Sequence, residues 1–233
     1  MKHNYQKELE KILEEKTTVG KRLFLHSCCA PCSSYVLLYL RRFFRITVFY
    51  YNPNITEQEE YQKRAAEQKR LIGVLNQESA SGETEGFLIE IQEGDYTPEV
   101  FFQTVRGLEQ CPEGGARCRK CFALRLEETA KRAKAQSIDF FTTTLTISPL
   151  KDAEALNEIG REMGDRYGIS FLPSDFKKRD GYKSSIALSR TYDLYRQEYC
   201  GCVFSEMQRQ EEVRRRQRMQ MEQPDGPLKE KRI

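Results

Sequence analysis

Apolar and polar positions along this chain follow two alternating patterns. Short runs of aliphatic, β-branched and aromatic residues are typical of buried strands, and segments with apolar residues every three or four positions are typical of helices. Five runs predict strands, at residues 22–25, 45–51, 87–91, 138–144 and 169–172. The other segments predict helices, at residues 3–16, 35–43, 56–76, 118–136, 183–199 and 204–222, with two more after Thr97 and after Pro149.

The order of these segments predicts the fold. Strands that alternate with helices indicate an α/β protein, with a parallel sheet of about five strands and helices on both faces. Right-handed crossovers place the turns that follow the strands along one edge of the sheet, where ligands bind in such folds. At the first of these turns, Pro31 suits the first turn of the following helix. Farther along, Thr56 with Glu59 has the pattern of a capping box.

Length and charge limit the domain organisation and the classes of function that the chain can have. We expect an N-terminal lead-in helix in residues 1–21, an α/β domain in residues 22–205 and a polar C-terminal helix and tail in residues 206–233. With 38 basic and 35 acidic residues, a net charge of +3 argues against a protein held to nucleic acid by charge alone. No apolar run approaches the roughly 18 residues of a membrane helix, and the polar N-terminus has no signal region. We therefore expect a cytoplasmic protein with no membrane partner.

The eight cysteines are the main chemical signal. They are rarely paired in disulfides in a reducing compartment, where clustered cysteines are more often metal ligands or catalytic groups. With only two histidines in the chain, a metal site has to consist mainly of thiolates. Seven of the eight fall into three groups, with Cys111 apart: Cys28, Cys29 and Cys32; Cys118 and Cys121; Cys200 and Cys202.

Spacing alone leaves the kind of site open. Two CxxC pairs are compatible with a four-cysteine zinc site in an RNA-binding protein, and one CxxC beside a strand with a thioredoxin-like dithiol oxidoreductase. Seven cysteines exceed the four that zinc uses, whereas an iron–sulfur cluster uses three or four and leaves thiolates for a second metal. The spacing therefore indicates a thiolate metal site, and iron–sulfur chemistry is favoured over zinc.

Several motifs, in order along the chain, resemble one enzyme family. They are residues 26–32 (HSCCAPC), 49–55 (FYYNPNI), 117–122 (RCRKCF), 142–149 (TTTLTISP), 175–178 (DFKK) and 195–202 (YRQEYCGC). Together they are similar to the QueH-type epoxyqueuosine reductases, and the resemblance covers residues from about 22 to 205. Only the lead-in helix and the tail lie outside it.

The resemblance implies a cytosolic oxidoreductase that acts on tRNA. It would reduce the epoxide of epoxyqueuosine in the anticodon loop to the alkene of queuosine, with electrons from a donor that the sequence does not identify. The family implies a 4Fe–4S cluster with an additional iron ion, and no cobalamin. It also implies a sheet similar to the adenine-nucleotide hydrolase-like (Rossmann-like) folds. The phosphate-binding Ser-Gly-Gly turn of ATP-using relatives is replaced here by residues 27–32, so we expect no ATP.

The resemblance also assigns metal ligands. The matching positions are Cys28, Cys29, Cys118, Cys121, Cys200 and Cys202. Relatives can carry Asp at position 32, and because carboxylate and thiolate both bind iron, Cys32 is a candidate ligand of the second metal and a candidate catalytic residue. Spacing does not settle which of these sulfurs hold the cluster and which hold the ion. Cys111 matches no ligand motif.

Removing the epoxide oxygen as water also needs a proton donor. Asp175, Asp95 and Tyr182 are candidates because they sit in loops expected along the same edge, and of these we assign the catalytic role to Asp175. His26 precedes the cysteines directly, and we interpret it as a hydrogen-bonded structural histidine rather than a ligand.

Basic and aromatic residues near these motifs are candidates for RNA contact. For the anticodon-loop phosphates they are Arg119, Lys120, Lys177 and Lys178, with Arg117, Arg125 and Arg179 beside them. For stacking on unpaired bases they are Tyr50, Tyr51 and Phe176. The run from Arg214 to Arg216 is interpreted as the polar face of a helix.

Overall fold

The fold is organised around one five-stranded sheet. The computed structural model describes residues 3–221. The strands are β1 (Arg22–His26), β2 (Arg45–Tyr50), β3 (Glu90–Glu93), β4 (Phe140–Thr143) and β5 (Ser170–Phe171). They are all parallel and lie in the order β3-β2-β1-β4-β5. The predicted α/β fold with a parallel sheet is therefore confirmed, and its strand order is that of a Rossmann-like sheet.

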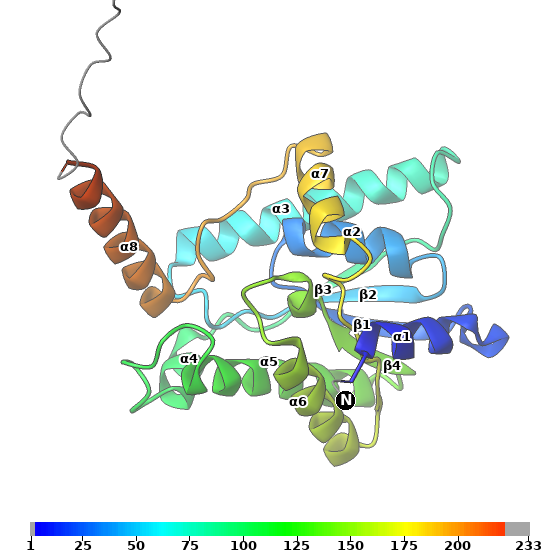
Figure 1. Cartoon of the computed structure of the whole chain (residues 1–233). Helices are drawn as coiled ribbons and strands as arrows, with labels where there is room; N and C mark the ends of the chain where they lie inside the picture. Colours follow the sequence, from blue (N-terminus) through cyan, green and yellow to red (C-terminus); the bar gives the residue numbers. More distant parts are fainter. Residues whose placement is uncertain (1–2, 222–233) are drawn as a thin grey trace, which may run out of the picture.

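Helices cover both faces of the sheet (Figure 1). They are α1 (Tyr5–Glu14), α2 (Ala30–Leu40), α3 (Gln58–Ala80), α4 (Pro98–Thr104), α5 (Ala116–Ala135), α6 (Ala153–Tyr167), α7 (Gly181–Thr191) and α8 (Val203–Met221), with the 3-10 turns η1 (Lys16–Thr18) and η2 (Thr144–Ile147). In Figure 1, α2, α3 and α7 lie above the sheet, and α4, α5 and α6 lie below it. The far end of α8 extends away from this body.

Alternation within the strands explains the two layers. Leu23 and Leu25 of β1 are buried in the cluster that contains the apolar side chains of α2. Phe24, between them, is buried on the other side with Phe122 and Leu126 of α5. Because successive side chains of a strand point to opposite faces, an apolar run such as this one needs helices on both sides.

The N-terminal helix shares the core of the sheet. Asn4 caps α1 by accepting a hydrogen bond from the backbone N–H of Lys7, which satisfies one free donor of the first turn. Leu9 and Leu13 are buried in the same cluster as the side chains of α2 and β1. Burial of these two leucines gives the lead-in helix its position against the sheet.

Three sequence-based predictions of local structure were wrong. Thr56 and Glu59 form no capping box: α3 begins at Gln58 without a side-chain cap, because the N–H of Thr56 bonds to the carbonyl of Gly201, 3.1 Å away. The third strand was expected at 87–91 but begins at Glu90, since the side chain of Asn76 bonds both backbone groups of Ile89.

The helix expected at 183–199 ends at Thr191. Asp193 has a left-handed backbone (φ 46°), and Arg70 of α3 donates to the carbonyls of Tyr192 and Asp193. The N–H of Tyr195 bonds to the carboxylate of Glu67, 2.8 Å away. These contacts from α3 replace the helical hydrogen bonds, so residues 192–202 run as an extended segment along the site described below.

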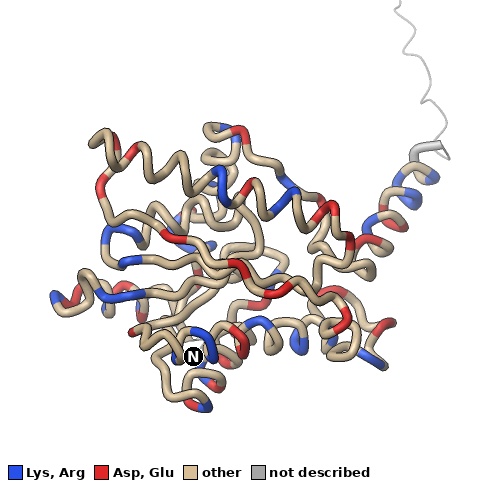
Figure 2. Tube along the Cα trace, turned by 180° about the vertical axis from the view of Figure 1, so that it is seen from behind, with Lys and Arg blue, Asp and Glu red and all other residues tan. Residues whose placement is uncertain are grey.

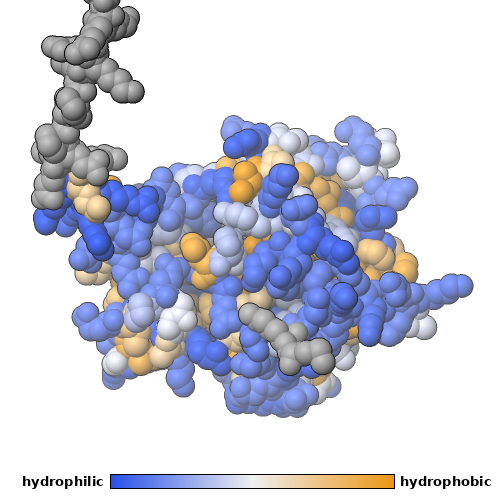
Figure 3. All heavy atoms as spheres, viewed as in Figure 1, coloured by the Kyte–Doolittle hydropathy of each residue, from blue (hydrophilic) through white to orange (hydrophobic). Residues whose placement is uncertain are grey.

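Charged residues of both signs are mixed along the described part of the chain. Figure 2 shows Lys and Arg interspersed with Asp and Glu along the trace, and Figure 3 shows a mainly hydrophilic face with scattered apolar residues. Within residues 3–221, no helix has both the length and the apolar character needed to cross a membrane. The predicted tail after Met221 lies outside the described residues.

We predict that Gly160→Ala destabilises the protein by about 1–3 kcal/mol, because a Cβ at Gly160 of α6 would lie 2.3 Å from the ring of Phe171 in β5. Gly73→Ala is the matched control: it also lies inside a helix, but nothing lies within 4 Å of its added Cβ. That change should stabilise α3 by up to about 1 kcal/mol. Urea unfolding followed by circular dichroism measures both, and equal effects would contradict the packing argument.

Candidate metal centre

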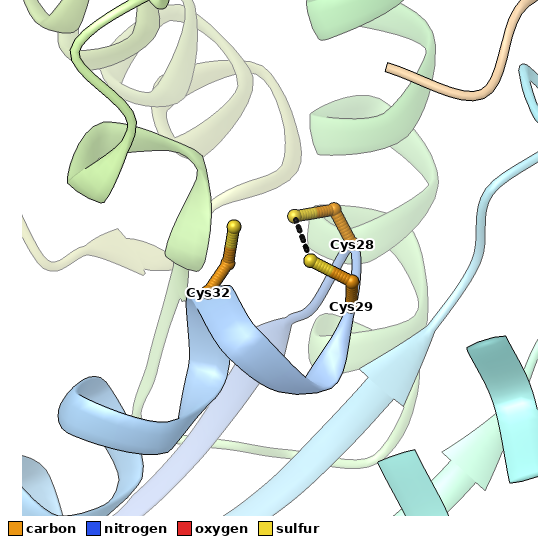
Figure 4. Close-up of side chains that lie close together, drawn as sticks. All are labelled: Cys28, Cys29 and Cys32. Carbon is orange, nitrogen blue, oxygen red and sulfur yellow. Dashed lines mark hydrogen bonds between the residues drawn. The ribbon is translucent and has the colours of Figure 1, made fainter. Parts of the chain in front are cut away.

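Three cysteine sulfurs meet where β1 ends and α2 begins. Cys28 and Cys29 lie in the turn between His26 and Ala30, and Cys32 lies in the first turn of α2. Their Sγ atoms lie within 4.8 Å of one another (Figure 4), and the Sγ atoms of Cys28 and Cys29 are 3.7 Å apart. Sulfurs this close can bind one metal ion together.

This turn lies at the topological switch point of the sheet. β1 is the central strand, with β2 and β3 on one side and β4 and β5 on the other, so a crevice forms beyond the ends of β1 and β4. Cys28 Sγ lies 3.7 Å from Oγ1 of Thr144, which follows β4. Beneath the turn, the hydroxyls of Ser27 and Ser33 both donate to Oε1 of Gln68, at 2.8 and 3.0 Å. This buried network holds the backbone that carries the sulfurs.

The remaining metal-ligand candidates surround a second, smaller cavity. Cys118 and Cys121 project from the first turns of α5, three residues apart and therefore on one side of the helix. Cys200 and Cys202 come from the turn before α8. All four line this cavity. The structure thus divides the seven predicted ligands into a three-sulfur set and a four-cysteine set.

The two sets adjoin. A larger cavity of about 460 Å³ is lined by Cys28, Cys32 and Cys200, among others. Cys200, Arg125, Glu113 and Ser205 line both this cavity and the smaller one. Cysteine groups from distant parts of the sequence therefore meet at the carboxyl edge of one sheet.

A glycine makes the Cys200–Cys202 turn possible. Gly201 has φ 110°, in the region that residues with a Cβ rarely adopt. A Cβ at this position would also lie 2.8 Å from Cγ1 of Ile55. Arg64 of α3 donates to the carbonyl of Cys200 at 3.2 Å, and Oγ of Ser205 accepts from its N–H at 3.0 Å. The turn is therefore held tightly from both sides.

Two arginines near the sulfurs are buried without carboxylate partners. Arg117 and Arg125 are each 1 % exposed, and N–H groups of both guanidiniums have no hydrogen-bond partner among residues 3–221. Burial alone lowers the pKa of Arg125, but the nearby Cys121, Cys200, Cys28 and Cys118 as thiolates raise it more, and the net shift is upward. Since a buried cation is costly without a counter-charge, these arginines fit anionic sulfur ligands.

The thiols themselves fit a site that exchanges protons for metal. Burial raises the pKa of Cys121 to about 11 and that of Cys202 to about 12. Both are therefore protonated at neutral pH when no cation binds them, and a metal must displace these protons. A thiolate-rich donor set of this kind suits iron, iron–sulfur clusters or zinc.

His26 is a structural residue, as its position indicated. It is fully buried, with Nδ1 2.8 Å from Oγ1 of Thr143 and Nε2 3.2 Å from the carbonyl oxygen of Tyr51. Burial lowers the pKa of His26 to about 3, so the ring is neutral. Its nitrogens are occupied by these contacts, and the interpretation as a hydrogen-bonded core histidine is confirmed.

The three predicted proton donors occupy different places. Tyr182 lines the larger cavity, at the start of α7. Asp175 does not line it and pairs with Lys177, whose Nζ is 3.1 Å away. Asp95 is exposed and pairs with Arg132 at 2.8 Å. The catalytic role of Asp175 stays a prediction that the lining of the cavity does not support.

The candidate RNA-contacting residues divide into exposed and buried groups. Arg119, Lys120 and Lys178 are exposed, while Lys177 is partly buried beside Asp175. Arg119 lies 3.3 Å from Glu158, in a surface ion pair. These four stay candidates for phosphate contact.

Arg179 is exposed and pairs with Glu10 at 3.0 Å, so it stays a candidate, but the remaining candidates of this kind are corrected. Arg117 and Arg125 lie beside the cysteines instead of at the surface. Tyr50, Tyr51 and Phe176 are also buried, in the apolar clusters of the fold, and cannot stack on an RNA base. Their aromatic character serves the core because they continue β2 or follow β5.

The structure adds residues that the sequence analysis did not single out. Lys151 and Glu113 form an ion pair in the wall of the larger cavity, 2.6 Å between Nζ and Oε1. Gln197, in the extended segment after α7, donates to Sγ of Cys29 at 2.8 Å. Gln197 lies within the motif at 195–202, and Lys151 follows the motif at 142–149 by two residues. Their closeness to these motifs is the signal by which the sequence could have identified them.

Comparison with known proteins identifies the family. A sequence model described as "Epoxyqueuosine reductase QueH" matches residues 23–208. Relatives with that name include a protein from Streptococcus pyogenes serotype M1, 42 % identical over 88 % of this chain and 78 % of its own length. Another, from Thermotoga maritima, is 32 % identical over 81 % of this chain and 92 % of its own length.

These matches extend over the sheet and both cysteine sets. The match to the family's sequence model extends from β1 to the first turn of α8, so it contains every cysteine of the two cavities. The chain therefore belongs to the epoxyqueuosine reductase QueH family.

Proposed function

We propose that this chain reduces the epoxide of epoxyqueuosine in tRNA to the alkene of queuosine. The observation that carries the proposal is the three-sulfur set, which opens onto a cavity of about 460 Å³ beside a second, four-cysteine set. Family membership supports the reaction. Because the substrate is a tRNA, we place the enzyme in the cytoplasm, with an electron donor as a further partner. The proposal includes neither cobalamin nor ATP, and both absences stay predictions.

The two sets suggest a division of the metal ligands. The four-cysteine set, Cys118, Cys121, Cys200 and Cys202, would hold a 4Fe–4S cluster, which takes four thiolates. The three-sulfur set, Cys28, Cys29 and Cys32, would hold the additional iron ion. When bound, these groups would supply single electrons and an electrophilic site for the epoxide oxygen.

The protein's own residues have distinct roles in this proposal. Arg125 and Arg117 offset the negative charge of the sulfur ligands inside the protein. Gln197 hydrogen-bonds Cys29 and so orients its sulfur. Leu145 and Ile147, which also line the larger cavity, limit the access of water.

The proposed contacts to tRNA lie at the rim of the larger cavity. Arg196 and Arg209 line the larger cavity, and we propose that they contact phosphates near the modified base. Arg119, Lys120, Lys177 and Lys178 are proposed as weaker, more distant phosphate contacts. Mixed surface charge suggests binding by a few placed cations rather than by one basic face.

Two other functions use the same cysteines. A zinc-stabilised RNA-binding protein fits the four-cysteine set, and a dithiol oxidoreductase would use the CxxC pair Cys29 and Cys32, whose sulfurs lie within 4.8 Å of each other. Zinc alone leaves the three-sulfur set without a role, and a dithiol enzyme leaves the four-cysteine set without one. Iron, sulfide and zinc analysis of anaerobically purified protein separates the three: the cluster gives iron, sulfide and a brown colour, the zinc protein gives zinc alone, and the dithiol enzyme needs no metal.

We predict that Cys118→Ser removes most of the bound iron and sulfide, because this sulfur belongs to the four-cysteine set. The measurement is iron and sulfide content with the visible absorption spectrum, all under anaerobic conditions. Cys111→Ser is the matched control: Cys111 lines neither cavity, so its iron content should stay near that of the unchanged protein. A cluster lost equally in both variants would contradict the assignment.

Substitutions at position 32 test whether Cys32 binds the second metal. We predict that Cys32→Ala keeps the visible absorption of the cluster, loses about one iron per chain and loses epoxide reduction. Cys32→Asp should retain measurable reduction, because a carboxylate can hold iron in place of a thiolate. Nucleoside analysis of epoxyqueuosine-containing tRNA, with chemically supplied electrons, gives the activity. A colourless Cys32→Ala protein would make Cys32 a cluster ligand instead.

The turn at Gly201 gives a third test. Gly201→Ala should destabilise the turn by about 1–2 kcal/mol from backbone strain alone, and more from contact with Ile55. We expect it to lose most of its cluster iron, because Cys200 and Cys202 move. Gly107→Ala controls for strain, since its φ is 81° but nothing lies within 4 Å of the added Cβ. If both variants bind iron normally, the turn does not position the ligands.

A further inference from the structure

A buried ion pair lies in the wall of the larger cavity, apart from the cysteine ligands. Lys151 follows η2 at the end of β4, and Glu113 precedes α5. Nζ of Lys151 is 2.6 Å from Oε1 of Glu113, and their side chains are 7 % and 30 % exposed. Both line the same cavity as Cys28 and Cys32. An amine and a carboxylate so placed face whatever the cavity binds.

Lys151 keeps its proton in this environment. Burial lowers the pKa of Lys151, but Cys200 as a thiolate and the Glu113 carboxylate raise it more, so the net shift is upward. The side chain is therefore an ammonium at neutral pH, shielded from bulk water and held beside the cavity. It is a proton source for a strong base only, such as an oxygen whose bond to carbon is breaking.

The proposed reaction needs protons at this place. Reduction of an epoxide breaks both C–O bonds, forms one C=C π bond and releases the oxygen as water. The substrate takes up two electrons, from a one-electron carrier or a chemical reductant that is oxidised, and the oxygen takes up two protons. A protic residue that lines the cavity is placed to deliver the first of them.

Other groups lining the cavity fit this role less well. Arg64, Arg125, Arg196 and Arg209 do not give up protons at physiological pH. Glu198 and Glu212 are largely exposed and therefore lie at the rim. Tyr182 is 36 % exposed and also lies toward solvent. Tyr199, the other phenol of the lining, has no carboxylate hydrogen-bonded to it within residues 3–221, and the Ser205 hydroxyl, which donates to Glu113, is a much weaker acid than an ammonium. Lys151 is a buried cation of this lining whose partner is a carboxylate that can return a proton.

We propose that Lys151 donates a proton to the epoxide oxygen and that Glu113 returns a proton to Lys151 from solvent. This inference rests on the proposed function. Glu113 suits the relay because it is more exposed than Lys151 and contacts it directly. Its other oxygen accepts from Oγ of Ser205 at 3.3 Å, which fixes the carboxylate between the two cysteine sets.

The test separates a proton donor from a fixed positive charge. Lys151→Arg keeps the charge but cannot release a proton, and Lys151→Ala removes both. We expect the single-turnover rate of epoxide reduction to fall roughly 100-fold or more in each. Iron content, visible absorption and tRNA affinity should stay near those of the unchanged protein. Lys134→Arg, at the opposite end of α5 from the cysteines, is the control and should leave all readouts unchanged.

Rescue by a small amine is a second test of proton donation by Lys151. Methylammonium should restore part of the rate in Lys151→Ala in proportion to its concentration, because it can occupy the vacated space and donate a proton. It should not rescue Lys151→Arg, whose side chain fills that space. Near-normal reduction by Lys151→Arg would overturn the proposal and leave Lys151 as a counter-charge. Loss of iron in Lys151→Ala without rescue would overturn it in favour of a structural role.

Failure of the proposed function gives a different result. If the unchanged protein, loaded with iron and sulfide, reduces no epoxyqueuosine, the proposed reaction fails and the proton-donor assignment fails with it. If the unchanged protein is active and Lys151→Arg is equally active, only the assignment of Lys151 fails.

Discussion

Charge balance inside the protein is the constraint on which the site depends. Arg125 lies buried among sulfurs that come from the β1 turn, from α5 and from the turn before α8. A guanidinium in this position needs negative charge nearby, and the cysteines supply it only as thiolates. In the proposed function, metal binding and the packing of three distant segments are therefore coupled, because each depends on the same buried charges.

The sheet supplies the geometry for this coupling. In the order β3-β2-β1-β4-β5, the turns after β1 and β4 flank one crevice, so Cys28 and Thr144 come within 3.7 Å although 116 residues separate them. At the turn after β1, this chain places three sulfurs. The hydroxyls of Ser27 and Ser33, which donate to Gln68, tie the backbone of that turn to α3.

The extended segment after α7 completes the site. Arg70 and Glu67 of α3 bind the backbone of residues 192–195, and Arg64 binds the carbonyl of Cys200. Charged side chains on one face of α3 thus bind the backbone of the segment that connects α7 to the four-cysteine set. Gln197 lies on this path and donates to Cys29, so the same segment contacts both cysteine sets.

The sequence by itself determined the fold class and the kind of chemistry. Strand and helix periods are local, so the five strands and most helices could be predicted within a few residues. The cysteine groups are contiguous motifs, and from them a thiolate metal site could be predicted. Errors arose where a side chain from elsewhere took the backbone hydrogen bonds, as Asn76 does at Ile89 and Arg70 at Tyr192.

Only the tertiary structure decided how these parts combine. It divided the cysteines into two sets, buried Arg117 and Arg125, and paired Lys151 with Glu113 across 38 residues. It also placed Tyr50 in the core, although its sequence neighbourhood suited RNA contact equally well. Burial and long-range pairing depend on which segments the sheet brings together, and no local pattern of residues encodes that choice.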